Sequence, residues 1–314
     1  MRLGTEGEQI MEDFIARLDS LLSGPDPSAA ESFMLDTLKS LENAESPDVN
    51  GMITVLSELG NYMRGVSRYG ESLEYYRRTV ELLEQSGSVS ALATARMNMA
   101  GTYRFMGRLP EAAELFLSVK ELLESTGQRT GPVYAATLNN LALNYCDMGK
   151  MKEALETSRQ SLRVVRSSGA DSFSLAMAIA NLAALQIRAG ELEEASENLD
   201  EALALFEISA PDDPHRAGAL SSKASLLVSS GKLDQALECV ALARSITRRV
   251  YGENADTALL DKNAASILKA MGDLPQAEKY INECLDICLR VYGKDNDRTR
   301  DASELLEQIK NERS

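Results

Sequence analysis

The sequence predicts an all-α, right-handed superhelical solenoid of helix-turn-helix repeats, and three observations support this fold class. The pattern Gly-x-Leu/Met-x-x-Ala recurs at intervals of 42, 41, 41 and 41 residues. Small residues stand seven positions before and five positions after each turn glycine. Amphipathic helical patterns flank each turn, so each copy is one helical hairpin. A single hairpin cannot bury its apolar face, and we therefore expect neighbouring copies to stack.

The turn position holds glycine in five copies and Ser67 in the first copy. The glycines are Gly107, Gly149, Gly190, Gly231 and Gly272. The small residues before the turn are Gly60, Ala100, Ala142, Ala183, Ala224 and Ala265, and those after it are Ser72, Ala112, Ala154, Ala195, Ala236 and Ala277. Small residues twelve positions apart across a turn lie on facing helices, where their lack of bulk lets the backbones approach closely.

Each predicted repeat boundary holds a residue that ends or starts a helix. Six repeats are expected at 47–88, 89–130, 131–170, 171–211, 212–252 and 253–293. Residues 1–46 are predicted to form a divergent N-terminal hairpin whose first helix ends at Gly24-Pro25-Asp26-Pro27. Residues 294–314 are predicted to form a capping helix with Leu305, Leu306 and Ile309 facing inward. The alternative is that these terminal helices form a homodimer.

Repeats with these small and apolar positions resemble tetratricopeptide repeats. The period of about 41 residues, the Asn140-Leu141-Ala142 triplet and the endings Tyr251-Gly252 and Tyr292-Gly293 are most similar to the long repeats of kinesin light chains and their bacterial relatives. The resemblance covers residues 47–293. It implies that the first helix of each repeat lines a concave surface. It implies no particular partner, since such repeats serve in unrelated assemblies.

The formal net charge of −15 disfavours nucleic acid and an anionic membrane as partners, because like charges repel. The most apolar stretch, Leu175 to Ile187, is interrupted by Asn181 and Gln186 and is predicted to be too short to span a bilayer. No basic and apolar leader opens the chain. We therefore expect a cytoplasmic protein.

The sequence shows no constellation of catalytic or metal-binding residues, so we expect neither an enzyme nor a cofactor or metal site. His215, the only histidine, is expected in a loop between repeats, and no glycine-rich phosphate-binding motif occurs. The cysteines, Cys146, Cys239, Cys284 and Cys288, form no Cys-x-x-Cys pair. They are expected to be reduced and mostly buried thiols.

The first helix of each repeat carries a stripe of residues 13, 10, 9, 6, 3 and 2 positions before the turn, which share one helix face. The position nine before the turn, called here the ladder position, holds Asn98, Asn140, Asn181 and Asn263, and Asn139 lies beside Asn140. An amide donates and accepts hydrogen bonds, so such a ladder can hold the main chain of an extended peptide. The alternative is that these amides bond neighbouring helices. Ser222 interrupts the ladder, and Lys223 follows it in a column otherwise apolar.

Five basic residues share the stripe with only two acidic residues, Glu58 and Asp147. The basic residues are Arg64, Arg104, Arg188, Lys262 and Lys269. This face has a net charge of +3 in a chain of net charge −15, so we expect it to attract acidic side chains. The alternative is that these charges are incidental and partly solvated.

Together these features predict a non-catalytic scaffold whose concave groove holds an extended, acidic segment of another polypeptide. Two alternatives stay open. One is a bacterial peptide-responsive regulator with the N-terminal hairpin as its output element, and the other is a self-assembling structural protein.

Overall fold

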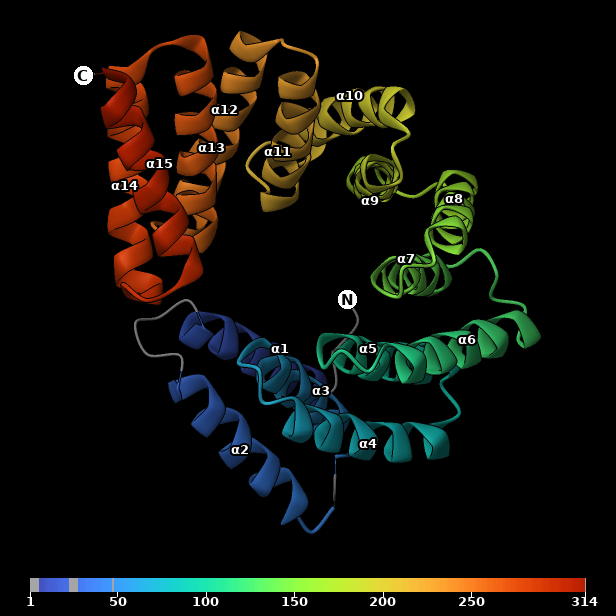
Figure 1. Ribbon diagram of the computed structural model, residues 1–314. Helices are drawn as coiled ribbons and strands as arrows, with labels where there is room; N and C mark the ends of the chain where they lie inside the picture. Colours follow the sequence, from blue (N-terminus) through green and yellow to red (C-terminus); the bar gives the residue numbers. More distant parts are fainter. Residues whose placement is uncertain (1–5, 23–27, 47, 314) are drawn as a thin grey trace. The chain divides into compact units, whose positions relative to one another are not determined.

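The computed structural model describes residues 6–22, 28–46 and 48–313, and every regular element in these ranges is an α-helix, as predicted (Figure 1). Backbone contacts group the chain into two compact units, residues 1–164 and 165–314. The helices of the first unit are α1 (Glu6–Leu22), α2 (Ser28–Glu42), α3 (Val49–Gly65), α4 (Tyr69–Ser86), α5 (Val89–Phe105), α6 (Leu109–Ser125) and α7 (Pro132–Asp147). Helix α8 (Met151–Ser167) spans the boundary. The predicted end of the first helix at residues 24–27 lies outside the described residues.

The second unit continues the series of paired helices. It contains α9 (Ser172–Ala189), α10 (Leu192–Ser209), α11 (Pro214–Ser229), α12 (Leu233–Tyr251), α13 (Ala255–Met271), α14 (Leu274–Tyr292) and α15 (Asp297–Arg313). Within each unit, a helix packs mainly against the helices that precede and follow it in the chain. His215 was expected between repeats, but it lies in the first turn of α11, beside the capping residue Asp213.

The six turns inside the repeats share one backbone conformation. The turn residue has φ between 63° at Ser67 and 84°, in the left-handed region that favours glycine. In the second repeat, the N–H of Gly107 donates to Arg104 O at 2.9 Å and the N–H of Arg108 donates to Tyr103 O at 2.9 Å. This pair of bonds occupies carbonyls that a helix end otherwise leaves open. The turn geometry therefore explains why glycine recurs at this position.

The small residues on both sides of the turn are buried where paired helices touch. Ala142 of α7 and Ala154 of α8 have no exposed surface. Gly60 of α3 lies so close to the ring of Tyr76 of α4 that a Cβ on Gly60 would come within 2.7 Å of the ring. The Tyr76 hydroxyl donates to Asn61 Oδ1 at 2.6 Å, beyond Gly60 on the same helix. A larger residue at Gly60 would push these two helices apart.

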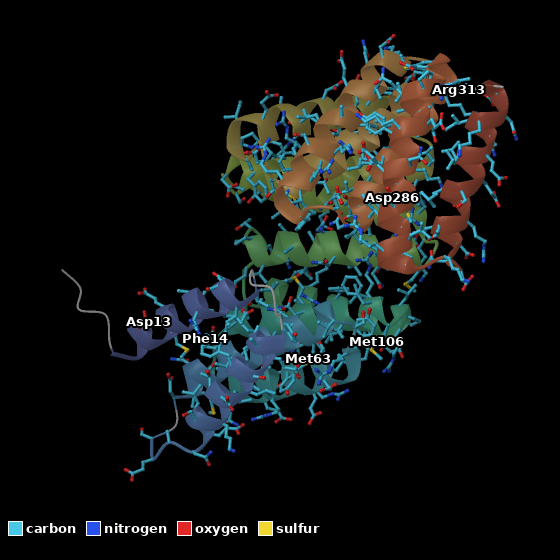
Figure 2. The ribbon with its side chains drawn as sticks, turned by 90° about the vertical axis from the view of Figure 1, so that its left-hand side faces the viewer. Asp13, Phe14, Met63, Met106, Asp286 and Arg313 are labelled. Atoms are coloured by element: carbon cyan, nitrogen blue, oxygen red, sulfur yellow. The ribbon has the colours of Figure 1, made fainter. Side chains whose placement is uncertain are left out.

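The terminal helices bury apolar faces against their neighbours. Phe14 of α1 and Met63 of α3 belong to one apolar cluster in the first unit (Figure 2). At the other end of the chain, Leu306 and Ile309 of α15 are buried against α14, and Leu305 packs at the edge of the same cluster. Most of the α15 face considered for a homodimer is thus covered within this chain.

Helix α9 differs from the sequence-based expectation in length. It has 18 residues and is long and apolar enough to cross a membrane by length and composition alone, so the expectation that this stretch is too short is wrong. Several of its apolar residues, including Ile179, Leu182 and Leu185, are buried inside the protein. In all, 33% of this 18-residue stretch is buried.

We expect Ser67→Gly to raise the free energy of unfolding by about 1 kcal/mol, because glycine adopts a positive φ without the steric strain of a Cβ. The reciprocal substitution Gly107→Ser should lower it by a similar amount. Urea denaturation followed by circular dichroism measures both values. If Ser67→Gly left the unfolding midpoint unchanged or lowered it, strain at this turn would be refuted.

Candidate functional site

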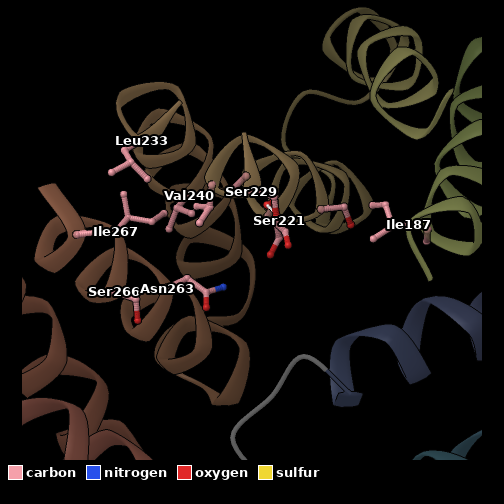
Figure 3. Close-up of a pocket in the computed structure, with 14 residues that line it drawn as sticks. Ile187, Ser221, Ser229, Leu233, Val240, Asn263, Ser266 and Ile267 are labelled. Carbon is pink, nitrogen blue, oxygen red and sulfur yellow. Dashed lines mark hydrogen bonds between the residues drawn. The ribbon is translucent and has the colours of Figure 1, made fainter. Parts of the chain in front are cut away.

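A hollow of about 550 Å³ opens on the second unit between α9, α11, α12 and α13 (Figure 3). Three of its lining residues, Ala184, Ser225 and Ser266, stand six positions before the turn in consecutive repeats. Two others, Ser222 and Asn263, occupy the ladder position. In this unit, stripe residues of three first helices therefore face one open space. Asn263, which was predicted to hold a peptide main chain, lines this hollow.

The ladder asparagines are neither buried nor fully exposed. Asn98, Asn139, Asn140, Asn181 and Asn263 are all partly accessible. The side chain of Asn140 donates to Ala136 O of its own helix at 3.0 Å. Asn139 and Asn181 also interact within the protein. In the described part of the chain, the side-chain amides of Asn98 and Asn263 have no hydrogen-bond partner.

Three stripe cations contact either the first helix of the following repeat or the C-terminal helix α15. Arg104 Nε of α5 lies 2.6 Å from Asp147 Oδ2 of α7. On α13, the Nζ of Lys262 lies 3.1 Å from Asp301 Oδ2, and the Nζ of Lys269 lies 2.9 Å from Glu312 Oε1, both on α15. These carboxylates neutralise part of the positive charge that the sequence indicated. The stripe cations therefore also connect successive repeats.

Arg64 and Arg188 differ from the other three stripe cations. The Nη1 of Arg64 donates to Asn98 O of α5 at 3.4 Å, and its Nη2 donates to Asn61 Oδ1 at 3.3 Å. Both acceptors are neutral, so no carboxylate pairs with Arg64 within the described residues. Arg188 is exposed at the end of α9 and also interacts within the protein.

Lys223 of α11 occupies a position that is apolar in the other repeats, and its contacts with α10 explain how the fold accommodates it. Its Nζ donates to Ser196 Oγ at 2.9 Å and to Asp200 Oδ2 at 2.7 Å, both on α10. Its side chain is only 12% exposed. This helix contact replaces the apolar packing found in the same column of other repeats.

The structure contains a buried charged group that the sequence analysis missed. Asp261 of α13 is fully buried, and Arg244 of α12 forms ion pairs with both Asp261 and Glu283 of α14. The Oδ2 atom of Asp261 has no hydrogen-bond partner in the described structure. Burial raises the pKa of Asp261 to about 6. Most other repeats have an apolar residue at the position of Asp261, so a comparison of the repeats could have revealed this carboxyl group. The apolar residues at this position are Leu56, Leu138, Ile179 and Leu220.

The cysteines have no arrangement suited to catalysis. Cys146, Cys284 and Cys288 are buried and Cys239 is half-buried. The Sγ atoms of Cys284 and Cys288 lie 3.9 Å apart, and burial raises the pKa of Cys284 to about 12. This thiol therefore stays protonated and unreactive at neutral pH. Among the described residues, no group of three or more His, Cys, Asp or Glu side chains could hold a metal ion.

Family models describe most of the chain as tetratricopeptide repeats. One such model matches residues 30–125 and 133–208, and a second matches residues 263–308. No curated protein matches the chain.

Solved structures share the fold at low sequence identity. BtubC (BKLC) from P. vanneervenii has a TM-score of 0.60 and 19% identity, over 77% of this chain and 91% of that chain. A putative kinesin light chain of Podosopora anserina with nearly identical TPR-like repeats has a TM-score of 0.54 and 21% identity, over 64% of this chain and 97% of that chain. A Rap protein complexed with competence and sporulation factor has a TM-score of 0.57 and 15% identity, over 96% of this chain and 98% of that chain. The predicted likeness to kinesin light chain repeats is thus confirmed at the level of the fold.

The buried carboxyl group predicts a specific dependence of stability on pH. The pKa of Asp261 is about 6 in the folded protein, above the value of about 3.9 for an unfolded chain. Protonation between pH 7.5 and 5 therefore favours the folded state. Relative to Asp261→Asn, the free energy of unfolding of the natural chain should rise by about 1 kcal/mol over this interval.

Denaturant titrations of both proteins at the two pH values measure this difference. The comparison cancels the titration of the remaining carboxylates. A difference between the two proteins that did not change with pH would show that Asp261 keeps an ordinary pKa.

Proposed function

This chain belongs to the tetratricopeptide repeat family, and from that premise we propose that it is a non-catalytic scaffold that holds an extended segment of another polypeptide. The observation that carries the proposal is the hollow of about 550 Å³ lined by stripe residues of α9, α11 and α13. Its volume lies within the range of roughly 300–1,000 Å³ that is usual for ligand sites. We also propose that it has no nucleic-acid or anionic-membrane partner, because its net charge of −15 would be repelled by their phosphates. A cytoplasmic location is a further part of this proposal.

The ladder asparagines supply the means to hold a main chain. The amides of Asn98 and Asn263 are partly accessible and have no hydrogen-bond partner in the described structure. Each can donate to a ligand carbonyl and accept from a ligand N–H, whatever the ligand side chains are. Asn140 keeps its oxygen and one N–H for this purpose, since its other N–H donates to Ala136 O.

The first unit is where we propose that acidic ligand side chains bind. Arg64 contacts only neutral acceptors, so its charge lacks a carboxylate partner in the described residues. A ligand carboxylate can also replace Asp147 on Arg104, because that pair is partly exposed and exposed pairs contribute only about 0–1 kcal/mol. Lys262 and Lys269 already contact carboxylates of α15 and are weaker candidates.

A second candidate function is that of a peptide-responsive regulator. The Rap protein whose structure matches 96% of this chain was solved in complex with competence and sporulation factor. Under this proposal, a short free peptide would bind the same helices and change the N-terminal hairpin. Homodimerisation stays a proposal for that hairpin, where Ile15, Leu22 and Leu35 are exposed.

Selection from a displayed library of random 15-residue peptides, with the purified full chain as bait, tests the scaffold function. We expect peptides that bind saturably and compete with one another. No enrichment over an unrelated helical protein would refute the proposal. A hairpin that becomes protected from hydrogen exchange when a peptide binds would favour the regulator.

For a selected peptide that binds the first unit, Asn98→Ala should weaken binding by about 1 kcal/mol, or roughly fivefold in Kd. Its thermal unfolding should not change, since its side chain forms no hydrogen bond in the described structure. Asn144→Ala is the matched control, because this buried amide donates to Leu109 O at 3.0 Å and its loss should lower stability instead. Titration calorimetry and thermal denaturation measure the two effects. Equal affinity of Asn98→Ala and the natural chain would remove Asn98 from the site.

A further inference from the structure

Helix α11 presents serine at four stripe positions, and these small side chains create the hollow in the second unit. The four residues are Ser221, Ser222, Ser225 and Ser229, and all of them line the hollow. Ser222 stands where other repeats carry a ladder asparagine. Ser221 and Asn263 point toward the same open space from neighbouring helices (Figure 3). The ladder of asparagines is therefore interrupted on α11, where the small serine side chains leave the hollow open.

Three of the five serine hydroxyls that line the hollow donate hydrogen bonds within the described structure. Ser222 Oγ donates to Gly218 O at 3.1 Å, and Ser229 Oγ donates to Ser225 O at 3.1 Å. On the facing helix α13, Ser266 Oγ donates to Lys262 O at 2.9 Å. Because these donors are already used, a ligand need not supply acceptors for them. The wall can therefore contact apolar groups without leaving these hydroxyl donors unpaired.

Larger apolar side chains surround the serines. Ile187 of α9, Val228 of α11, Val240 of α12 and Ile267 of α13 line the same hollow. Val240 and Ile267 are almost fully buried, so the accessible apolar side chains among these four are Ile187 and Val228, on two different helices. Burial of an apolar group in the hollow gains about 25 cal/mol per Å² of apolar surface removed from water.

None of the residues that line the hollow within the described structure carries a charge. Lys262 and Lys269 lie on α13 but pair with carboxylates of α15. A charged ligand side chain placed in this hollow would lose hydration without gaining a partner of opposite charge. The hollow therefore differs from the first unit, where Arg64 lacks a carboxylate partner.

We infer that the hollow receives a bulky, uncharged side chain of the bound polypeptide, of the leucine, isoleucine, methionine or phenylalanine type. The amide of Asn263 at its edge holds the adjoining main chain. This inference rests on the proposed scaffold function and specifies the ligand chemistry at α9 to α13. The partner segment thus carries an apolar anchor for the second unit.

A thermodynamic cycle tests the anchor. The probes are a leucine-containing peptide selected from the random library and the same peptide with that leucine changed to alanine. On the natural chain, the change should weaken binding at least tenfold. Ser225→Phe fills the hollow and should abolish this difference, because the leucine can no longer enter. Ser225 is exposed, so the variant should fold, and Ser229→Leu serves as a second filling variant.

Leu143→Phe is the matched control, since Leu143 of α7 is partly accessible and holds the same repeat position in the first unit. This variant places the same phenylalanine on the stripe at a residue that does not line the hollow. The tenfold effect of the leucine should therefore persist in it.

Two results would overturn the inference. One is a leucine effect that persists in Ser225→Phe. The other is a set of acidic peptides that are weakened by Lys262→Ala or Lys269→Ala but not by Ser225→Phe, an outcome that leaves the scaffold function standing. Failure to select any peptide would overturn both proposals.

Discussion

The close approach of two helices across a left-handed turn is the constraint on which the rest of this structure depends. The turn residue, represented by Gly107, takes a positive φ, and the small residues around it are buried between the helices. A bulky residue at a small position would separate the pair, since a Cβ on Gly60 would come within 2.7 Å of the Tyr76 ring. At the turn, a Cβ on Gly107 would meet no neighbour, and the positive φ alone restricts the residue. Because this contact sets which face of the first helix is buried, it also sets which face stays open. The open stripe is therefore a consequence of packing on the opposite side.

Under the proposed function, the cations on this stripe would have two competing roles. Arg104 pairs with Asp147 on the first helix of the following repeat, and Lys262 pairs with Asp301 on the C-terminal helix α15. Such contacts link helices that follow one another in the stack. Exposed ion pairs contribute little to stability, so a ligand carboxylate can replace the internal partner at small cost. Net charge along the stripe is therefore a poor guide to the ligand. A better guide is whether each cation already has a carboxylate partner in the described structure. Lys262 has one, and Arg64 does not.

Features that are local or recur at a fixed interval could be predicted from the sequence. The turn glycines, the substitution of Ser67 in the first turn and the buried alanines are of this kind. The pairing of Arg104 with Asp147 could not, because the residues are 43 positions apart and their side-chain rotamers decide the contact. Lys223 and Asp261 break columns that are mostly apolar elsewhere, so the sequence marks them as unusual. It does not show that Lys223 turns toward α10 while Asp261 is buried beside Arg244.

The irregular repeat carries more information about binding than the regular ones. In a solenoid each repeat touches only its neighbours, so a substitution on the open stripe changes few packed contacts. Ser222 stands in place of an asparagine, so this repeat lacks the side-chain amide at the ladder position. The burial of Ala224 is unchanged. The fold therefore tolerates variation on the stripe while it restricts the turn and the small residues. Under the proposed function, selectivity for a ligand can come from positions where the repeats differ. The serines of α11 that line the hollow are such positions.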